Sequence, residues 1–94
     1  MRFEWDEAKN RANQHKHGIS FELALRVFAD PFHVLVPDRI VGGEVRWQAF
    51  GVIPFGLLMV VHTLRDEDEI EVIRIISARP ATKHERRRYD DENI

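Results

Sequence analysis

Two apolar stretches joined by an acidic segment decide the fold: GLLMVVHTL at residues 56–64 and IEVIRIISA at residues 70–78, with DEDE at 66–69 between them. Both are rich in β-branched and other apolar residues, which favours strands with little solvent contact. A short polar segment between two such runs is typical of a hairpin turn. We therefore expect these two strands to pair as an antiparallel hairpin at the centre of a sheet.

Further strands are expected on the N-terminal side of this hairpin. After Pro31 apolar residues alternate over residues 32–36, and a second run at residues 45–53 follows the turn region at Gly42-Gly43. A period of two is the pattern of a half-buried strand. Together with the central hairpin, these runs predict an antiparallel sheet of about four strands.

The N-terminal third is expected to contain two helices. Residues 7–17 form the first, between an N-cap at Asp6 and Gly18, and its mostly polar interior predicts a surface helix. Ser20 can cap a second helix, which carries apolar residues at helical spacing until Asp30-Pro31 and should enter the core.

The two ends of the chain complete the predicted architecture. Phe3 and Trp5 alternate with charged residues and predict either a short opening strand or an apolar clamp before the first helix. Thr82 and Glu85 form the T-x-x-E capping box of a last helix that continues to the end. The order predicts an α+β domain with two N-terminal helices, an antiparallel sheet of about four strands and a C-terminal helix.

Length and composition limit the class of protein. The chain has 94 residues, so we expect one domain over residues 1–94, because two cores of half that size would each be marginal. It has no cysteine, which excludes disulfides and thiolate chemistry. Its longest mainly apolar stretch, residues 52–64, is too short to cross a bilayer core of about 30 Å. With no signal-peptide pattern at the charged N-terminus, we expect a cytoplasmic protein without membrane association.

Charge is strongly segregated along the chain, although the formal net charge is only −2. Residues 74–88 contain six cations and one acid, Glu85, whereas acidic runs at 66–71 and 90–92 flank them. Because the Debye length is about 8 Å at physiological salt, a local basic patch can bind phosphates despite distant acids. The alternative is a solvated helix face with intrahelical ion pairs.

Several polar residues lie in or beside the two central strands. His62 interrupts an apolar strand and is either a hydrogen-bonded core histidine or a proton-transfer group. Arg74 lies in mid-strand and needs an acidic partner or a ligand, because an unpaired cation is costly there. Strict alternation puts Ser77 and Arg79 on the face opposite Arg74. Hairpin pairing puts Arg65 and Arg79 at opposite ends of the strand pair.

The sequence contains no motif for a metal or a cofactor. Neither H-E-x-x-H spacing nor a Gly-rich phosphate loop occurs. The remaining Arg, His, Ser and Tyr side chains suit phosphodiester chemistry without a metal or cofactor. Arginines can stabilise charge on the scissile phosphate, while His or Tyr can move protons at the 2′-hydroxyl and the leaving 5′-oxygen.

Four segments together resemble the BrnT family of type II toxin–antitoxin systems. They are FEWDEAKNRANQHKHGISFELALRVFADP at 3–31, RW at 46–47, VVHTLR at 60–65 and RIISARPATKHERRRY at 74–89. The resemblance implies a RelE-like fold and a ribonuclease toxin that cleaves RNA and inhibits translation. It also implies a BrnA-like antitoxin, whose ribbon-helix-helix part binds operator DNA, in a heterotetramer or a higher even assembly.

The resemblance also implies roles for single residues. The catalytic candidates are His62, Arg65, Arg79 and Tyr89, with the arginines at the scissile phosphate and the histidine or tyrosine transferring protons. The candidates for RNA contacts are Arg74, Ser77, Lys83 and Arg86. If only one of the catalytic arginines acts, Arg79 is favoured, because the hairpin separates the two too far to grip one phosphate unless the strand bends.

A different class of function is a non-enzymatic protein-interaction module. In that interpretation the basic C-terminal helix, with Phe3 and Trp5 if they are exposed, docks an acidic or apolar partner segment. Direct DNA binding is disfavoured because no basic recognition helix follows a tight turn. Operator DNA would then be reached only through the antitoxin.

Overall fold

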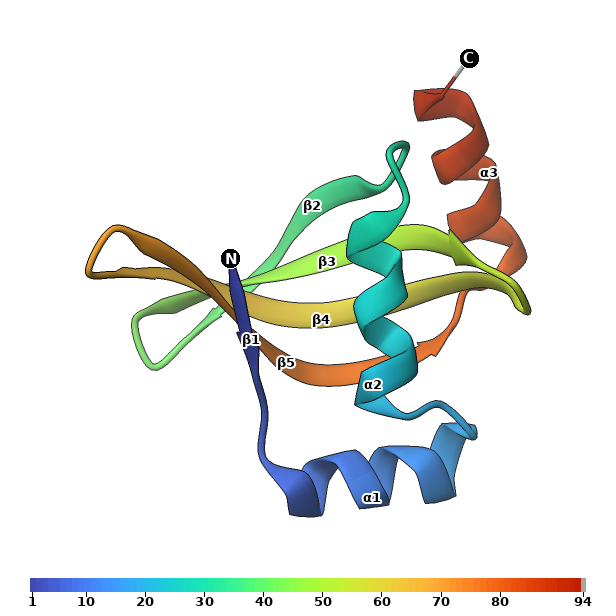
Figure 1. Ribbon diagram of the computed structural model, residues 1–94. Coiled ribbons are helices and arrows are strands. Elements are labelled where there is room, and N and C mark those ends of the chain that lie inside the picture. Colours follow the sequence, from blue (N-terminus) through green and yellow to red (C-terminus); the bar gives the residue numbers. More distant parts are fainter. Residues whose placement is uncertain (94) are drawn as a thin grey trace.

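The computed structural model describes residues 1–93, which form a five-stranded sheet with helices on both faces and at one edge (Figure 1). The strand order is β1-β5-β4-β3-β2. The elements in chain order are β1 (Arg2–Glu4), α1 (Glu7–His17), α2 (Phe21–Ala24), the 3₁₀ helix η1 (Leu25–Ala29), β2 (Val34–Val41), β3 (Glu44–Ile53), β4 (Gly56–Glu67), β5 (Ile70–Pro80) and α3 (Lys83–Glu92). No helix of these described residues is long and apolar enough to span a membrane.

The predicted central hairpin is confirmed, but the predicted sheet of about four antiparallel strands is wrong. β1 adds a fifth strand that pairs parallel with β5, so the sheet is mixed. Phe3 in β1 packs against Phe28 at a ring separation of 5.5 Å, and Trp5 packs edge-on against Phe21. Burial of these aromatic rings stabilises a strand of only three residues.

The prediction of two N-terminal helices is also wrong, because only α1 is a regular helix of several turns. The second segment begins at the predicted Ser20 cap, forms a single α-helical turn in α2 and continues as η1. Over so short a segment, apolar residues three and four apart fit a period of 3.0 as well as 3.6. The segment still enters the core as expected, with Phe21, Ala24 and Val27 fully buried.

The two faces of the sheet carry separate apolar clusters. On the first face, α2 and η1 lie across the middle strands (Figure 1). Gly51 of β3 permits this close approach, since a Cβ there would lie 2.7 Å from the carbonyl oxygen of Val27. On the second face, Tyr89 of α3 packs over Phe50 and Met59 at one end of the sheet. Partly buried valines of β2 and β4 pack against this cluster, namely Val34, Val36 and Val61.

The first helix has the predicted bounds, with Asp6 capping its N-terminus and Gly18 in the left-handed conformation at its C-terminus. Its packed side consists of asparagines, which the sequence reading missed. Asn13 donates to the carbonyl oxygen of Ala78 at 2.8 Å and accepts from the amide of Ala78 at 3.2 Å. One side chain thus replaces a neighbouring strand at the edge of β5 beyond the end of β1.

Candidate active site on the open face of the sheet

A β-bulge in β5 determines which side chains share a face. Val61 lies opposite Ser77, but the next residue of β4, His62, lies opposite Ile75. Ile76 is therefore an extra residue with no partner on β4. Successive residues of a strand point to opposite faces. One extra residue therefore turns every side chain beyond the bulge to the face opposite the one that uninterrupted alternation would give.

The bulge brings together three candidate residues that strict alternation would separate. Directly opposite residues in an antiparallel pair share a face. Arg74 lies opposite Thr63, and Arg79 lies opposite Met59. Residues 59, 61 and 63 of β4 alternate regularly and lie on one face, so Arg74, Ser77 and Arg79 all lie on that face too. The expectation that Arg74 lies opposite the other two is wrong.

A further cation on this face, Arg46 of β3, was not among the predicted site residues. It lies opposite Thr63, and Thr63 lies opposite Arg74 on the next strand. The three residues form a row across β3, β4 and β5, with neighbouring strands about 4.8 Å apart. Among residues 1–93, Arg46 is half-buried and has no carboxylate within ion-pair distance. The strand register, which the sequence does not specify, is the signal that identifies it.

We call this surface the open face. It is defined by Arg46, Gln48, Val61, Thr63, Arg74, Ser77 and Arg79.

Arg79 is held at the point where β5 leads into α3. Its Nη1 and Nη2 atoms donate to the two carboxylate oxygens of Glu85 at 2.7 and 2.9 Å, and Nη1 also donates to the Pro80 carbonyl oxygen at 3.1 Å. Hydrogen bonding from Arg79 is the main cause that holds the pKa of Glu85 below its ordinary value. The Arg79 side chain remains one-third exposed.

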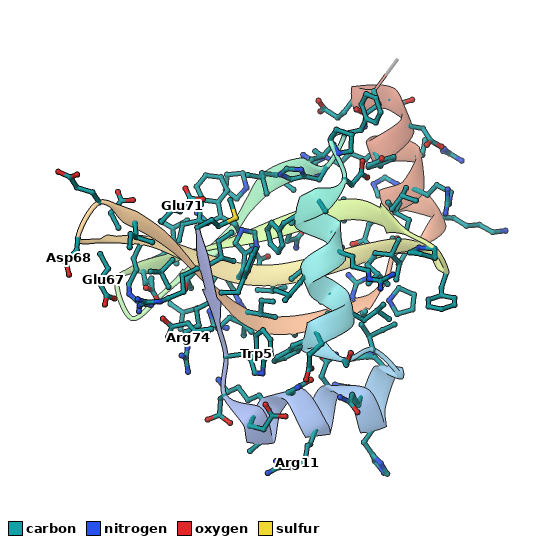
Figure 2. All side chains as sticks on the ribbon, viewed as in Figure 1. Trp5, Arg11, Glu67, Asp68, Glu71 and Arg74 are labelled. Carbon is teal, nitrogen blue, oxygen red and sulfur yellow. The ribbon has the colours of Figure 1, made fainter. Side chains whose placement is uncertain are left out.

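Arg74 has the acidic partner that its mid-strand position requires. Its Nη1 donates to Glu4 of β1 at 2.8 Å, and Arg65 donates to the other oxygen of the same carboxylate. These bonds, led by the one from Arg65, lower the pKa of Glu4. Figure 2 shows Arg74 on the half of the sheet that ends in the acidic turn at Asp68.

Arg65 is not brought to the same point as Arg79, as the hairpin prediction required. Arg65 lies opposite Val72 and Arg79 lies opposite Met59, so six positions of β4 separate them. At about 3.3 Å per residue this is roughly 20 Å along the strand. Arg65 instead pairs with Glu4 and with Glu67 of its own strand.

His62 lies on the first face, in the core beneath η1. It is fully buried, and its ring meets the ring of Phe28 edge-on at a centroid distance of 5.0 Å. Its Nδ1 lies 3.4 Å from the Val60 carbonyl oxygen, while its Nε2 has no partner among the described residues. Burial lowers the pKa of His62 to about 4, so the ring is neutral at neutral pH.

Tyr89 anchors α3 to the segment that precedes β2. Its hydroxyl donates to Oδ2 of Asp30 at 2.7 Å, and that carboxylate also accepts from the backbone amides of Val52 and Phe32. Burial and the Asp30 carboxylate raise the pKa of Tyr89 to about 12. The Tyr89 hydroxyl is therefore protonated, and its proton is held in the hydrogen bond to Asp30.

The remaining predicted RNA contacts are Ser77, on the open face near the β5 edge, and two residues of α3. Ser77 lines a shallow depression of about 240 Å³ at the β5 edge, whose cationic groups, Lys9 and Lys16, come from α1. Lys83 and Arg86 are exposed on α3. Within residues 1–93, no group of three histidine or acidic side chains is placed to hold a metal ion.

The fold and this face define a small α+β protein whose sheet presents arginines suited to a phosphate chain. The chain belongs to the family of BrnT, the ribonuclease toxin of type II toxin–antitoxin systems, whose family model matches residues 5–85. Membership implies an RNA substrate and an antitoxin partner. No curated protein matches the chain.

Proposed function

We propose that this protein is a metal-independent endoribonuclease that binds RNA on its open face, and that its RNA cleavage inhibits translation in the cytoplasm. The observation that supports this most directly is the placement of Arg74, Ser77 and Arg79 on one face, next to Arg46. Several cations on one surface can contact successive phosphates of a single strand.

Arg79 is the residue we assign to the scissile phosphate. In the proposed step the 2′-oxygen attacks phosphorus, the bond from phosphorus to the 5′-oxygen breaks, and a 2′,3′-cyclic phosphate and a 5′-hydroxyl result. Negative charge increases on the non-bridging oxygens during the attack. An arginine fixed beside them stabilises that charge more in the transition state than in the ground state.

Neither predicted proton-transfer group has a free side chain on the open face. The His62 ring is buried on the other face, and the Tyr89 hydroxyl is bonded to Asp30. We therefore assign the rate enhancement to positioning and to the arginine charge. Water accepts the proton of the 2′-hydroxyl and supplies one to the leaving 5′-oxygen.

The RNA backbone would extend in both directions from Arg79. Arg74 and Arg46 offer contacts along the sheet, and exposed Lys83 and Arg86 offer contacts along α3. Ser77 connects this path to the cationic side of α1. We assign Arg65 a structural role, because its ion pair with Glu4 holds β1 against the sheet.

The antitoxin is proposed to be BrnA-like. A segment of it would cover the open face and α3, while its ribbon-helix-helix part binds operator DNA. Such dimeric DNA-binding parts give an assembly of even stoichiometry, a heterotetramer or larger.

The test is incubation of the purified protein with RNA in the presence of EDTA, with analysis of the product ends. Cleavage that survives the chelator and leaves 2′,3′-cyclic phosphates is expected. A protein that cleaves no RNA, either alone or with ribosomes, would instead be the non-enzymatic interaction module that uses the basic C-terminal helix.

A further inference from the structure

We infer that Glu85 is a positioning residue that fixes the guanidinium of Arg79 in the orientation needed for a phosphate. This inference rests on the proposed ribonuclease function. It assigns Glu85 a role through Arg79, not a contact with RNA.

The hydrogen bonds of Arg79 leave one edge of its guanidinium free. A guanidinium has five N–H donors. Nη1 uses its two on Glu85 and on the Pro80 carbonyl oxygen, and Nη2 uses one on Glu85. The donor of Nε and the second donor of Nη2 have no acceptor among residues 1–93. These two lie parallel on one edge of the planar group and match two oxygens of a phosphate.

Glu85 is itself fixed by the start of α3. Its Oε1 accepts from the backbone amide of Thr82 at 2.9 Å, while its own amide donates to the Thr82 hydroxyl at 3.2 Å. Its side chain is only 16% exposed. The carboxylate that binds Arg79 is therefore also held by the backbone amide of Thr82, which does not depend on the Thr82 side chain.

Glu85 should affect the orientation of Arg79 and the electrostatic attraction of RNA in opposite ways. The Glu85 carboxylate holds the guanidinium in place, but its negative charge opposes a nearby phosphate. Its removal should therefore slow the chemical step without weakening RNA binding. A residue needed only for folding would not give this combination.

The test compares Glu85→Gln with Thr82→Ala. Glutamine can still accept from the Thr82 amide in a capping box, but its amide cannot accept both donors of Arg79. Thr82→Ala removes the hydroxyl cap and leaves the Glu85 carboxylate, so it controls for loss of helix stability. Each variant is measured for kcat on RNA and for Kd of an uncleavable RNA that carries 2′-O-methyl groups. The same pair is measured again in an Arg79→Ala background.

We expect Glu85→Gln to lower kcat by about tenfold or more, with Kd unchanged or tighter, and Thr82→Ala to leave both within about twofold. In the Arg79→Ala background Glu85→Gln should have no further effect on kcat. The inference is overturned if Glu85→Gln retains kcat, weakens RNA binding, or lowers kcat equally without Arg79. In each of these cases the wild-type protein still cleaves RNA, whereas failure of the proposed function leaves no cleavage in the wild type.

Discussion

The hydroxyl of Tyr89 donates to Asp30 at 2.7 Å and thereby connects the last helix to the segment between η1 and β2. The same carboxylate holds two backbone amides, so the aspartate is a junction between three segments of chain. This contact makes Tyr89 an anchor for α3 rather than a free acid or base.

Replacement of Tyr89 by phenylalanine should therefore reduce stability more than activity. Loss of a hydrogen bond to a charged group costs roughly 1.5–3 kcal/mol of unfolding free energy. The cleavage rate per folded molecule should stay within about threefold of wild type. Urea denaturation and RNA cleavage at a temperature where both proteins are folded measure the two effects. An inactive but equally stable variant would show that Tyr89 transfers a proton.

His62 should contribute a pH dependence of stability but no catalysis. Its folded pKa of about 4 lies below the ordinary value of 6.5, so between these values the unfolded chain binds more protons. Stability from this group is therefore complete above pH 6.5 and is lost as the pH falls toward 4. We expect a decrease of up to about 3 kcal/mol across this range, before the carboxylates with lowered pKa contribute at still lower pH.

The variant His62→Leu separates the two roles. It removes the titrating ring and its unpartnered Nε2, and it should flatten the stability profile between pH 6.5 and about 4 while retaining RNA cleavage. Thermal unfolding over a pH series provides the measurement. If His62→Leu unfolds with the wild-type pH profile but no longer cleaves RNA, our placement of this residue outside the chemistry is wrong.

Asn13 should protect the edge of β5. Asn13→Ala removes both hydrogen bonds to Ala78 and leaves the backbone amide and carbonyl group of Ala78 unpaired. The loss should lower the unfolding free energy by roughly 2–3 kcal/mol. Hydrogen exchange at the Ala78 amide should accelerate strongly. Asn13→Asp retains the acceptor of the Ala78 amide but sets a carboxylate oxygen against the carbonyl oxygens of Ile19 and Ala78, so it should also lose protection. Unchanged exchange in both variants would contradict the edge-pairing role.

Arg46 should contribute to RNA binding through charge. Arg46→Ala should weaken binding and reduce the slope of log Kd against log salt by about 0.7, the value for one phosphate contact on a single strand. Arg11→Ala is the matched control, because Arg11 projects from α1 away from the sheet (Figure 2). Equal slopes of log Kd against log salt for the two variants would show that Arg46 does not contact the RNA backbone.

The sequence predicted the central hairpin, the capping box of α3 and the bounds of α1, because these depend on local periodicity and on caps. It could not predict that β1 is parallel to β5, since the two strands are far apart in sequence and Phe3 in β1 pairs through tertiary packing. The bulge at Ile76 has no local signature either. That one residue moves Arg74 to the face of Ser77 and Arg79, so strict alternation assigned Arg74 to the wrong face.

The sequence also could not predict that His62 and Tyr89 are buried. A histidine inside an apolar strand can face either side, and only the register shows that His62 lies beneath η1. Tyr89 appeared available because its partner, Asp30, belongs to a distant segment.

The most direct test of the account compares Arg79→Ala with Arg65→Ala in RNA cleavage with EDTA present. Both substitutions remove an arginine that lies on the open-face side of the sheet and is paired with glutamate, but only Arg79 lies at the start of α3. Arg65 lies roughly 20 Å away along β4. We predict that Arg79→Ala lowers kcat by about a hundredfold or more, while Arg65→Ala stays within about threefold of wild type. Undiminished cleavage by a folded Arg79→Ala protein, or a loss confined to Arg65→Ala, would contradict the account.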